Sequence, residues 1–296
     1  MLVLYPEFNR DNATKLANIL GVDASEIYIR IFPNGEVLVR LPEIDRIKND
    51  DVIVYFPTYP DTNNRLIMLF QTIEALRYYR ANTITLVMPY LSYSRQDKRF
   101  LEGESLSLRL LLDILSTFGV DRLVTINPHN EEAVRINARN IDVIIMDVFT
   151  PLVNKVLANV RYDGNLILAA PDYGRCDTVK NLADEFGLDY ICLKKLRDRI
   201  TGEVLLQKDV DINLAGASVV IVDDEISTGG TVAKAAKLLK NDGAKSIYAA
   251  AIHLLLVGDA ADKLYSSGIE AIFGTNTIEN PYILVDIEPI LAEVFR

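Results

Sequence analysis

The sequence predicts an α/β fold with two similar domains, each a mainly parallel sheet flanked by helices. Short apolar runs rich in β-branched residues, without polar alternation, are typical of parallel strands buried on both faces. Segments with helical apolar spacing separate these runs, which indicates right-handed strand–helix–strand crossovers. The predicted strands are 52–56, 84–88, 123–126, 143–146, 166–169, 219–222 and 247–252, and the predicted helices are 65–79, 105–118, 151–159, 178–186 and 231–240.

The chain length and an internal echo support two domains. At roughly 100 to 200 residues per domain, 296 residues suit two units that each bury a core. Residues 52–89 contain a strand, a turn, a helix and a second strand, and residues 219–253 repeat this layout. We therefore predict one domain at 1–146, joined by the tail 281–296, and another at 147–280.

Composition excludes several classes of protein. The chain has 31 Lys and Arg against 41 Asp and Glu, a net charge of -10, which argues against general nucleic-acid binding. No apolar run approaches the ~20 residues of a membrane-spanning helix, so no membrane partner is expected. The N-terminus lacks the features of a secretory signal, and the two cysteines, Cys176 and Cys192, show no metal-binding spacing. We expect a cytoplasmic protein with two buried thiols.

The strongest chemical signal lies at 219–231, where a buried strand leads into two acids, a hydroxyl-rich Gly-Gly turn and a helix. The glycines let the backbone approach a ligand, and a helix start offers N–H groups to a phosphate. The two carboxylates can accept hydrogen bonds from ribose hydroxyls or bind magnesium through water. The candidate residues for a sugar phosphate are Asp223, Asp224, Ser227, Thr228, Gly229, Gly230 and Thr231.

Other interpretations of this segment are weaker. A plain strand-to-helix turn with Asp224 or Ser227 as the helix cap would need only one such residue. The sequence has no G-x-x-x-x-G-K-[ST] and no G-x-G-x-x-G, so neither a Walker A loop nor a dinucleotide fingerprint is present.

The acidic pair followed by Thr-Gly-Gly-Thr resembles the phosphoribosyl-binding loop of type I phosphoribosyltransferases. Together with the motifs described next, it also resembles the ribose-phosphate diphosphokinase (phosphoribosyl pyrophosphate synthetase) family, whose C-terminal half is phosphoribosyltransferase-like. The loop alone does not separate the two. Ser227 stands where the family commonly has Asp, and its hydroxyl can still donate to a phosphate.

Residues 32–36, Phe-Pro-Asn-Gly-Glu, resemble the family's F-x-D-G-E motif, which contacts ATP. An aromatic ring such as Phe32 can stack on adenine, and Asn34 and Glu36 can read the base edge. Asn34 replaces the family's Asp. The alternative is an ordinary Pro-Asn-Gly turn before a strand.

Residues 89–100 follow a predicted buried strand and resemble the family's P-Y-x-x-Y-x-R-Q-D signature. Arg95 suits bidentate phosphate contact, and Gln96 and Asp97 can bind adenine or sugar groups. The alternative is a solvated basic loop with Asp97 as its internal counterion.

Two residues at strand ends are implied as magnesium ligands. His129, in Ile-Asn-Pro-His-Asn, resembles the family's histidine that meets magnesium and the ATP phosphates, and Asp172, in Pro-Asp-Tyr-Gly, resembles its metal-binding acid. Magnesium accepts few protein ligands and keeps water and phosphate oxygens. A structural histidine and a helix N-cap are the alternatives.

Lys195 and Arg197 match the family's K-x-R, whose cations neutralise the transferring group from a mobile loop. Two residues apart, they point the same way if the backbone is extended. We expect the strand around Tyr190 to end here and an irregular segment to run to Ala215. Lys194 is the alternative participant, and an exposed basic strand end is the structural interpretation.

The resemblance covers essentially the whole chain and implies a reaction. The β,γ-diphosphoryl group of ATP is transferred to the C1 hydroxyl of ribose 5-phosphate, giving 5-phospho-α-D-ribosyl 1-diphosphate and AMP. The implied cofactor is Mg²⁺, the implied partners are the two substrates, and the implied assembly is a homo-oligomer. The alternatives are a type I phosphoribosyltransferase and a non-catalytic regulatory homologue.

Overall fold

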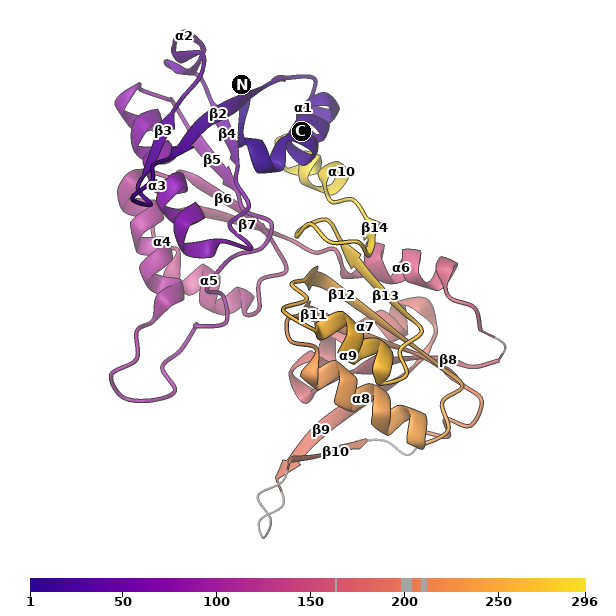
Figure 1. Cartoon of the computed structure of the whole chain (residues 1–296). Coiled ribbons are helices and arrows are strands. Elements are labelled where there is room, and N and C mark those ends of the chain that lie inside the picture. Colours follow the sequence, from indigo (N-terminus) through magenta and orange to yellow (C-terminus); the bar gives the residue numbers. More distant parts are fainter. Residues whose placement is uncertain (163, 198–203, 209–211) are drawn as a thin grey trace. The chain divides into compact units, whose positions relative to one another are not determined.

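The chain forms two compact α/β units (Figure 1). The structure, a computed structural model, describes residues 1–162, 164–197, 204–208 and 212–296, and within these the side chains of 195–208 are left aside. Unit 1 contains Met1–Asp147 and Ile287–Arg296, and unit 2 contains Val148–Asp286. No helix of the described residues is long and apolar enough to cross a membrane.

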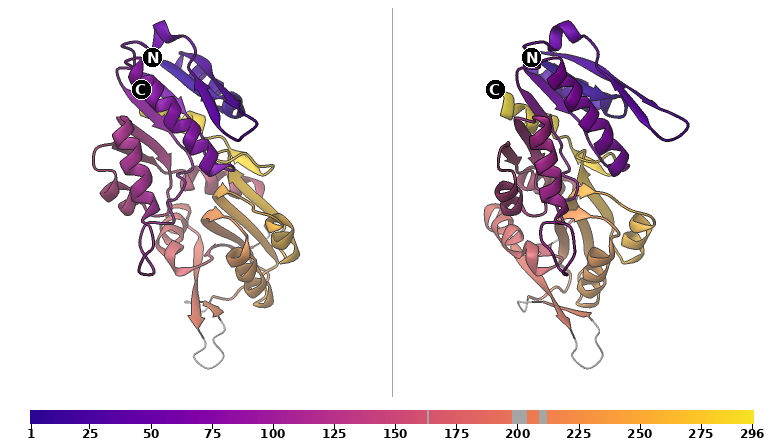
Figure 2. Two further views of the ribbon diagram at one scale, coloured as in Figure 1. Left: turned by 60° about the vertical axis from the view of Figure 1, so that its left-hand side comes forward. Right: turned by 90° about the vertical axis from the view of Figure 1, so that its left-hand side faces the viewer.

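Unit 1 is built on a seven-stranded sheet in the order β3-β2-β1-β4-β5-β6-β7. All neighbouring strands are parallel except β2 and β3, which form an antiparallel hairpin at one edge. Helices α1 and α10 pack together on one face, and α3 and α4 lie on the other (Figures 1 and 2). The elements are β1 Leu2–Pro6, α1 Arg10–Leu20, β2 Asp23–Ile31, β3 Val37–Arg40, α2 Ile44–Ile47, β4 Val52–Tyr55, α3 Thr62–Tyr78, β5 Ile84–Val87, α4 Ser107–Phe118, β6 Arg122–Ile126, α5 Glu131–Asn137, β7 Asp142–Met146 and α10 Glu288–Leu291, with 3-10 helices η1 Glu7–Asn9 and η3 Ala292–Phe295.

Unit 2 is built on a second seven-stranded sheet, in the order β10-β9-β8-β11-β12-β13-β14. Among the described strands of this sheet, β9 and β10 at one edge pair antiparallel and all other neighbours pair in parallel. The elements are α6 Phe149–Asn159, β8 Leu166–Ala170, η2 Tyr173–Arg175, α7 Cys176–Phe186, β9 Asp189–Arg197, β10 Val204–Lys208, β11 Ser218–Ile226, α8 Gly230–Asn241, β12 Ser246–Leu254, α9 Ala260–Ser266, β13 Ala271–Thr275 and β14 Ile283–Val285.

The two sheets have the same strand order when each is numbered from its own first strand, which explains the internal echo. β4 of unit 1 and β11 of unit 2 each occupy the fourth position, and β5 and β12 each occupy the fifth. The predicted fold class, two similar domains with mainly parallel sheets flanked by helices, is confirmed. The hairpins β2–β3 and β9–β10 also occupy equivalent edges.

Helix α4 shows how the sequence pattern produces this packing. Leu108, Leu111, Leu112 and Leu115 recur at helical spacing, and all four are buried against the unit 1 sheet. The helix ends at Gly119, whose φ of 94° lies in the left-handed region that favours glycine.

The C-terminal tail departs from the predicted boundary. β14 pairs in parallel with β13 and completes the unit 2 sheet, so residues 281–286 belong to unit 2 rather than to the tail. From Ile287 onward the chain packs in unit 1, where the Tyr55 hydroxyl donates to Glu288 Oε1 at 2.9 Å. Both residues are buried.

Candidate active site

The acid loop, residues 223–231, lies at the carboxyl end of β11 in unit 2. The strand runs beyond its predicted end at residue 222 and carries both acids, with Asp223 opposite Ala251 of β12. The Asp224 carboxylate is buried and pairs with Arg175, whose Nη2 lies 3.0 Å from Asp224 Oδ2. The backbone N–H of Asp224 donates to Asp223 Oδ1 at 2.9 Å. The two acids therefore have fixed and different surroundings.

Asp223 has a pKa well above its usual value of 3.8. The main cause is desolvation of the carboxyl group, and the adjacent Asp224 adds to the shift through its negative charge and a hydrogen bond. The Arg175 guanidinium acts in the opposite direction, while the Asp172 carboxylate raises the pKa further. Asp223 therefore keeps its proton to a higher pH than an ordinary aspartate.

The Gly-Gly turn starts helix α8 without using the acids. The N-cap is Gly229, with φ 71°, and no side chain caps the helix, so the interpretation of Asp224 or Ser227 as a cap is wrong. A Cβ at Gly229 would meet Ala260 O at 3.3 Å, so glycine is needed for its conformation and for its close approach to α9. Lys263 of α9 donates to the Thr228 carbonyl at 3.0 Å.

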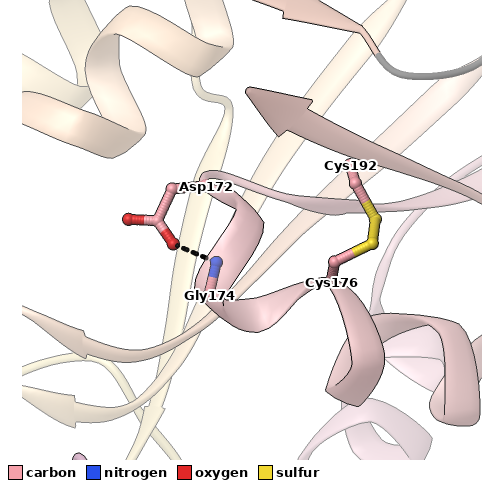
Figure 3. Close-up of a disulfide and its surroundings, with 4 residues drawn as sticks. All are labelled: Asp172, Gly174, Cys176 and Cys192. Atoms are coloured by element: carbon pink, nitrogen blue, oxygen red, sulfur yellow. Dashed lines mark hydrogen bonds between the residues drawn. A yellow bond between two sulfur atoms is a disulfide. The ribbon is translucent and has the colours of Figure 1, made fainter. Parts of the chain in front are cut away.

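Asp172 lies in the turn between β8 and α7 (Figure 3). Its Oδ1 accepts from the Gly174 N–H at 3.1 Å, so the N-cap interpretation is confirmed for the short helix η2. This contact uses one of the ~4 acceptor positions of a carboxylate and is compatible with metal binding.

The cysteine prediction is wrong. Cys176, the first residue of α7, and Cys192 of β9 form a disulfide with Cα atoms 5.3 Å apart, instead of two buried thiols (Figure 3). No spacing pattern in the sequence indicates this pair, because the two residues are brought together only when β9 packs beside β8.

The segment carrying Lys195 and Arg197 is a strand and not the predicted irregular stretch. Both residues lie in β9, where Lys195 is opposite Leu206 of β10 and Arg197 is opposite Val204. The side chains of Lys195 and Arg197 are outside the described part of the chain. Lys194 is described, and its Nζ lies 4.8 Å from the centre of the Tyr173 ring.

In unit 1, residues 32–36 form the turn of the β2–β3 hairpin. Phe32 N–H donates to Glu36 O at 2.8 Å, and Glu36 N–H donates to Asn34 Oδ1 at 3.2 Å. The Arg30 guanidinium lies 4.9 Å from the centre of the Phe32 ring, which is half-buried. Asn34 and Glu36 are exposed, so the turn is also an accessible surface.

The loops after β5 and β6 are joined by a hydrogen bond. Asn130 Nδ2 donates to Asp97 Oδ2 at 2.6 Å, while the Asn130 Oδ1 caps α5 by accepting from Ala133 N–H. Arg95, Gln96 and His129 are exposed on these loops. The structure thus brings the 89–100 segment beside the His129 segment within unit 1.

These features define a class: a two-unit α/β protein with an acidic strand end and a Gly-Gly turn at the start of a helix in its second unit. The family model for the N-terminal domain of ribose phosphate pyrophosphokinase matches residues 1–119, and the model for the phosphoribosyl synthetase-associated domain matches 207–294. The chain is 38% identical to the ribose-phosphate pyrophosphokinase of Saccharolobus solfataricus over 94% of each chain, and 32% identical to that of Methanopyrus kandleri over 99% of this chain and 98% of that one.

A solved structure of phosphoribosylpyrophosphate synthetase from Mycobacterium smegmatis matches with a TM-score of 0.88 and 29% identity, covering 100% of this chain and 97% of the other. The chain belongs to the ribose-phosphate pyrophosphokinase family. The predicted enzyme class and the main functional prediction are confirmed. The roles of individual residues stay predictions.

Three contacts were not predicted from the sequence. In unit 2, Arg175 pairs with Asp224 and Lys263 donates to the Thr228 carbonyl, and in unit 1, Asn130 donates to Asp97. Arg175 directly follows the Asp172 motif, which was the one signal that could have marked it.

Proposed function

We propose that the acid loop binds ribose 5-phosphate and that the unit 1 loops bind ATP for diphosphoryl transfer to the C1 hydroxyl. The observation that carries this proposal is the acid loop itself. Two acids and a hydroxyl-rich turn precede α8 although no side chain is used to cap that helix. The products are AMP and 5-phospho-α-D-ribosyl 1-diphosphate.

Different residues of the acid loop bind the two ends of the sugar phosphate. The carboxyl oxygens of Asp223 and Asp224 accept hydrogen bonds from the ribose hydroxyls, which are donors. The backbone N–H groups and hydroxyls of the turn hold the phosphate at the start of a helix. The phosphate ligands in this assignment are Ser227, Thr228, Gly229, Gly230 and Thr231.

The nucleotide is assigned to exposed polar groups of unit 1. Phe32 stacks on adenine and Asn34 and Glu36 read its edge, with the Asn34 amide nitrogen available as a donor because its oxygen holds the turn. Arg95 contacts phosphate, Gln96 and Asp97 bind adenine or sugar groups, and His129 meets the phosphates. The loops at the carboxyl ends of β5 and β6, where α/β sheets bind ligands, carry Arg95, Gln96, Asp97 and His129.

Mg²⁺ is the proposed cofactor, with His129 and Asp172 as its protein ligands. The Asp172 carboxylate suits this hard cation, which prefers oxygen ligands. Among the residues that the structure describes, no group of three or more His, Cys, Asp and Glu gathers as a metal site, so water and substrate phosphates would complete the coordination. When bound, magnesium neutralises negative charge on the ATP phosphates.

Lys195 and Arg197 are assigned to the charge that develops during transfer. Attack of the C1 oxygen on the β-phosphorus in line with the leaving oxygen depends on positioning and charge neutralisation more than on covalent chemistry. Two cations close together in the sequence would serve that purpose.

We predict that Lys195→Ala lowers kcat by about 100-fold or more and changes substrate affinity little, since a charge needed only in the transition state is removed. Steady-state kinetics and calorimetric binding of ribose 5-phosphate measure the two effects. Lys180→Ala, an exposed lysine on α7, is the control. An unchanged kcat for Lys195→Ala contradicts this assignment.

The whole proposal is tested by incubating the purified protein with ATP, ribose 5-phosphate and Mg²⁺ and measuring AMP. Stoichiometric AMP and a sugar diphosphate product support it. A type I phosphoribosyltransferase would instead consume the sugar diphosphate when given a nucleobase, and a regulatory homologue would bind ligands without turnover.

We also propose a cytoplasmic homo-oligomer, a dimer or larger. Light scattering coupled to gel filtration measures the assembly, and a mass equal to the 33.1 kDa chain contradicts it. Cell fractionation measures the compartment, a point of interest because stable disulfides are rare in most cytosolic proteins.

A further inference from the structure

Arg175 is the residue near the acid loop to which neither the motifs nor the proposed mechanism gives a role. Its Nη2 lies 3.0 Å from Asp224 Oδ2, and the two side chains are 17% and 6% exposed. The pair joins η2, which follows β8, to the carboxyl end of the neighbouring strand β11. A nearly buried carboxylate needs such a partner, because desolvation of a lone charge is costly.

The short segment that carries Arg175 is fixed at both ends. On its N-terminal side, the Asp172 carboxylate caps the turn through Gly174 N–H at 3.1 Å, and Arg175 N–H donates to Asp172 O at 3.3 Å. On its C-terminal side, the next residue, Cys176, is covalently bound to Cys192 of β9 (Figure 3). The disulfide therefore ties the backbone beside Arg175 to the central sheet of unit 2.

The Arg175 guanidinium also counteracts the crowding of negative charge. Desolvation is the main cause of the raised pKa of Asp223, the charges of Asp224 and Asp172 raise it further, and the Arg175 guanidinium lowers it. The Arg175 guanidinium thus supplies positive charge beside the two acids of β11.

We propose that Arg175 is a positioning residue of the ribose 5-phosphate site. Its guanidinium holds the Asp224 carboxylate in the orientation that accepts ribose hydroxyls, and the Cys176–Cys192 disulfide holds Arg175 in place. This inference rests on the proposed assignment of the acid loop to ribose 5-phosphate. It adds a side chain and a covalent bond that act on substrate affinity without touching the reacting atoms.

The first experiment compares Arg175→Met with Arg175→Lys and with the control Arg161→Met, an exposed arginine of unit 2. We expect Arg175→Met to raise KM for ribose 5-phosphate about 10-fold or more while KM for ATP stays within about 2-fold. Arg175→Lys keeps the charge and should recover part of the affinity, which a purely structural role would not require. Equal ribose 5-phosphate KM values for Arg175→Met and the control overturn the proposal.

The second experiment uses the wild-type protein and so does not depend on whether a variant folds. A phosphine reductant supplies two electrons and becomes the phosphine oxide with oxygen from water, while the disulfide becomes two thiols. We expect the reduced protein, verified by thiol alkylation and mass, to show a higher KM for ribose 5-phosphate with KM for ATP unchanged. The doubly substituted Cys176→Ala, Cys192→Ala protein should match it and should not respond to the reductant.

These experiments distinguish the role of the disulfide from the binding of ribose 5-phosphate by the acid loop. If complete reduction leaves KM for ribose 5-phosphate unchanged, the role of the disulfide is overturned, and AMP formation by the wild type still supports the proposed function. If the wild type forms no AMP and binds no ribose 5-phosphate, the assignment of the acid loop itself fails.

Discussion

At the residue scale, Asp223 and Asp224 are identical side chains that the structure gives different surroundings. Successive residues of a strand point to opposite faces, so the neighbours Asp223 and Asp224 on β11 meet different partners. Asp224 is buried against Arg175, whereas Asp223 is half-buried and its carboxyl group is desolvated beside a like charge. The two acids should therefore contribute differently to substrate binding.

The raised pKa of Asp223 predicts that the KM for ribose 5-phosphate depends on pH. A protonated carboxyl is a poorer acceptor for ribose hydroxyls, so KM should fall as pH rises through the raised pKa and then level off. The free energy of unfolding should change in the direction opposite to the affinity for ribose 5-phosphate. The stabilisation that comes from Asp223 is fully present below pH 3.8 and is lost as pH rises through the pKa of Asp223 in the folded protein.

Kinetics of the wild type and Asp223→Asn across the pH range measure this effect. The variant keeps the pH dependence that comes from the substrate phosphate, whose second pKa is about 6, and should lose the rest. Identical pH profiles for the two proteins would show that Asp223 does not control binding.

Gly229 is the residue at which the Gly-Gly turn, the proposed phosphate site, should be most sensitive to substitution. Gly229→Ala places a Cβ 3.3 Å from Ala260 O in a left-handed conformation, so we expect a loss of about 1–2 kcal/mol of unfolding free energy and a raised KM for ribose 5-phosphate. Gly187→Ala is the matched control, with φ 66° and no atom within 4 Å of the added Cβ. Denaturant unfolding should show a stability loss for both variants, larger at Gly229 because of the contact with Ala260 O, and kinetics should show a raised KM at Gly229 alone.

At the element scale, the two antiparallel hairpins have equivalent places and carry corresponding motifs. The turn 32–36 joins β2 and β3, and the K-x-R residues lie in β9 of the β9–β10 pair. An antiparallel hairpin is accommodated at the edge of a parallel sheet, where its outer strand faces no further neighbour. Each unit thus presents one proposed ligand-binding motif on an edge hairpin.

The C-terminal element α10 is fixed by one buried hydrogen bond that we expect to be measurable. Tyr55→Phe removes the donor to Glu288 Oε1, so the free energy of unfolding should fall by about 1–3 kcal/mol. Tyr78→Phe, at a residue 73% exposed, is the control.

The same bond has a pH signature. Burial, followed by the charge of Glu288, raises the pKa of Tyr55 well above 10.0. The stabilisation that comes from Tyr55 is present below pH 10.0 and is lost as pH rises through the pKa of Tyr55 in the folded protein. The difference in free energy of unfolding between wild type and Tyr55→Phe should therefore narrow in strong alkali. A gap that stays constant, or that is absent at neutral pH, would contradict this account of the tail.

At the scale of the whole molecule, each unit has its own hydrophobic core, and the proposal assigns one substrate to each. The unit 1 core includes Leu69 of α3 and Leu112 of α4, and the unit 2 core includes Val219 of β11 and Leu239 of α8. Separate cores allow ligand effects to be localised within the chain.

Hydrogen exchange measured by mass spectrometry should show this division. Ribose 5-phosphate alone should slow exchange at 223–231, because ligand contacts suppress local opening, and AMP alone should slow it at 89–100. Inorganic sulfate is the control for non-specific anion binding. Protection of 89–100 by ribose 5-phosphate alone would contradict the assignment.

Local sequence patterns predicted the alternating strands and helices, the shared layout of the two units and the acid loop, since these depend on periodicity and turn residues within short windows. These patterns did not indicate β1, an interior strand of the unit 1 sheet, or the antiparallel edge strands. Three contacts depend on the tertiary structure. The Arg175–Asp224 ion pair joins residues 49 positions apart in the sequence, the Tyr55–Glu288 hydrogen bond joins residues 233 positions apart, and the disulfide joins residues 16 positions apart. The physical reason is that each such pair depends on which strands become neighbours, and no local pattern of residues specifies that.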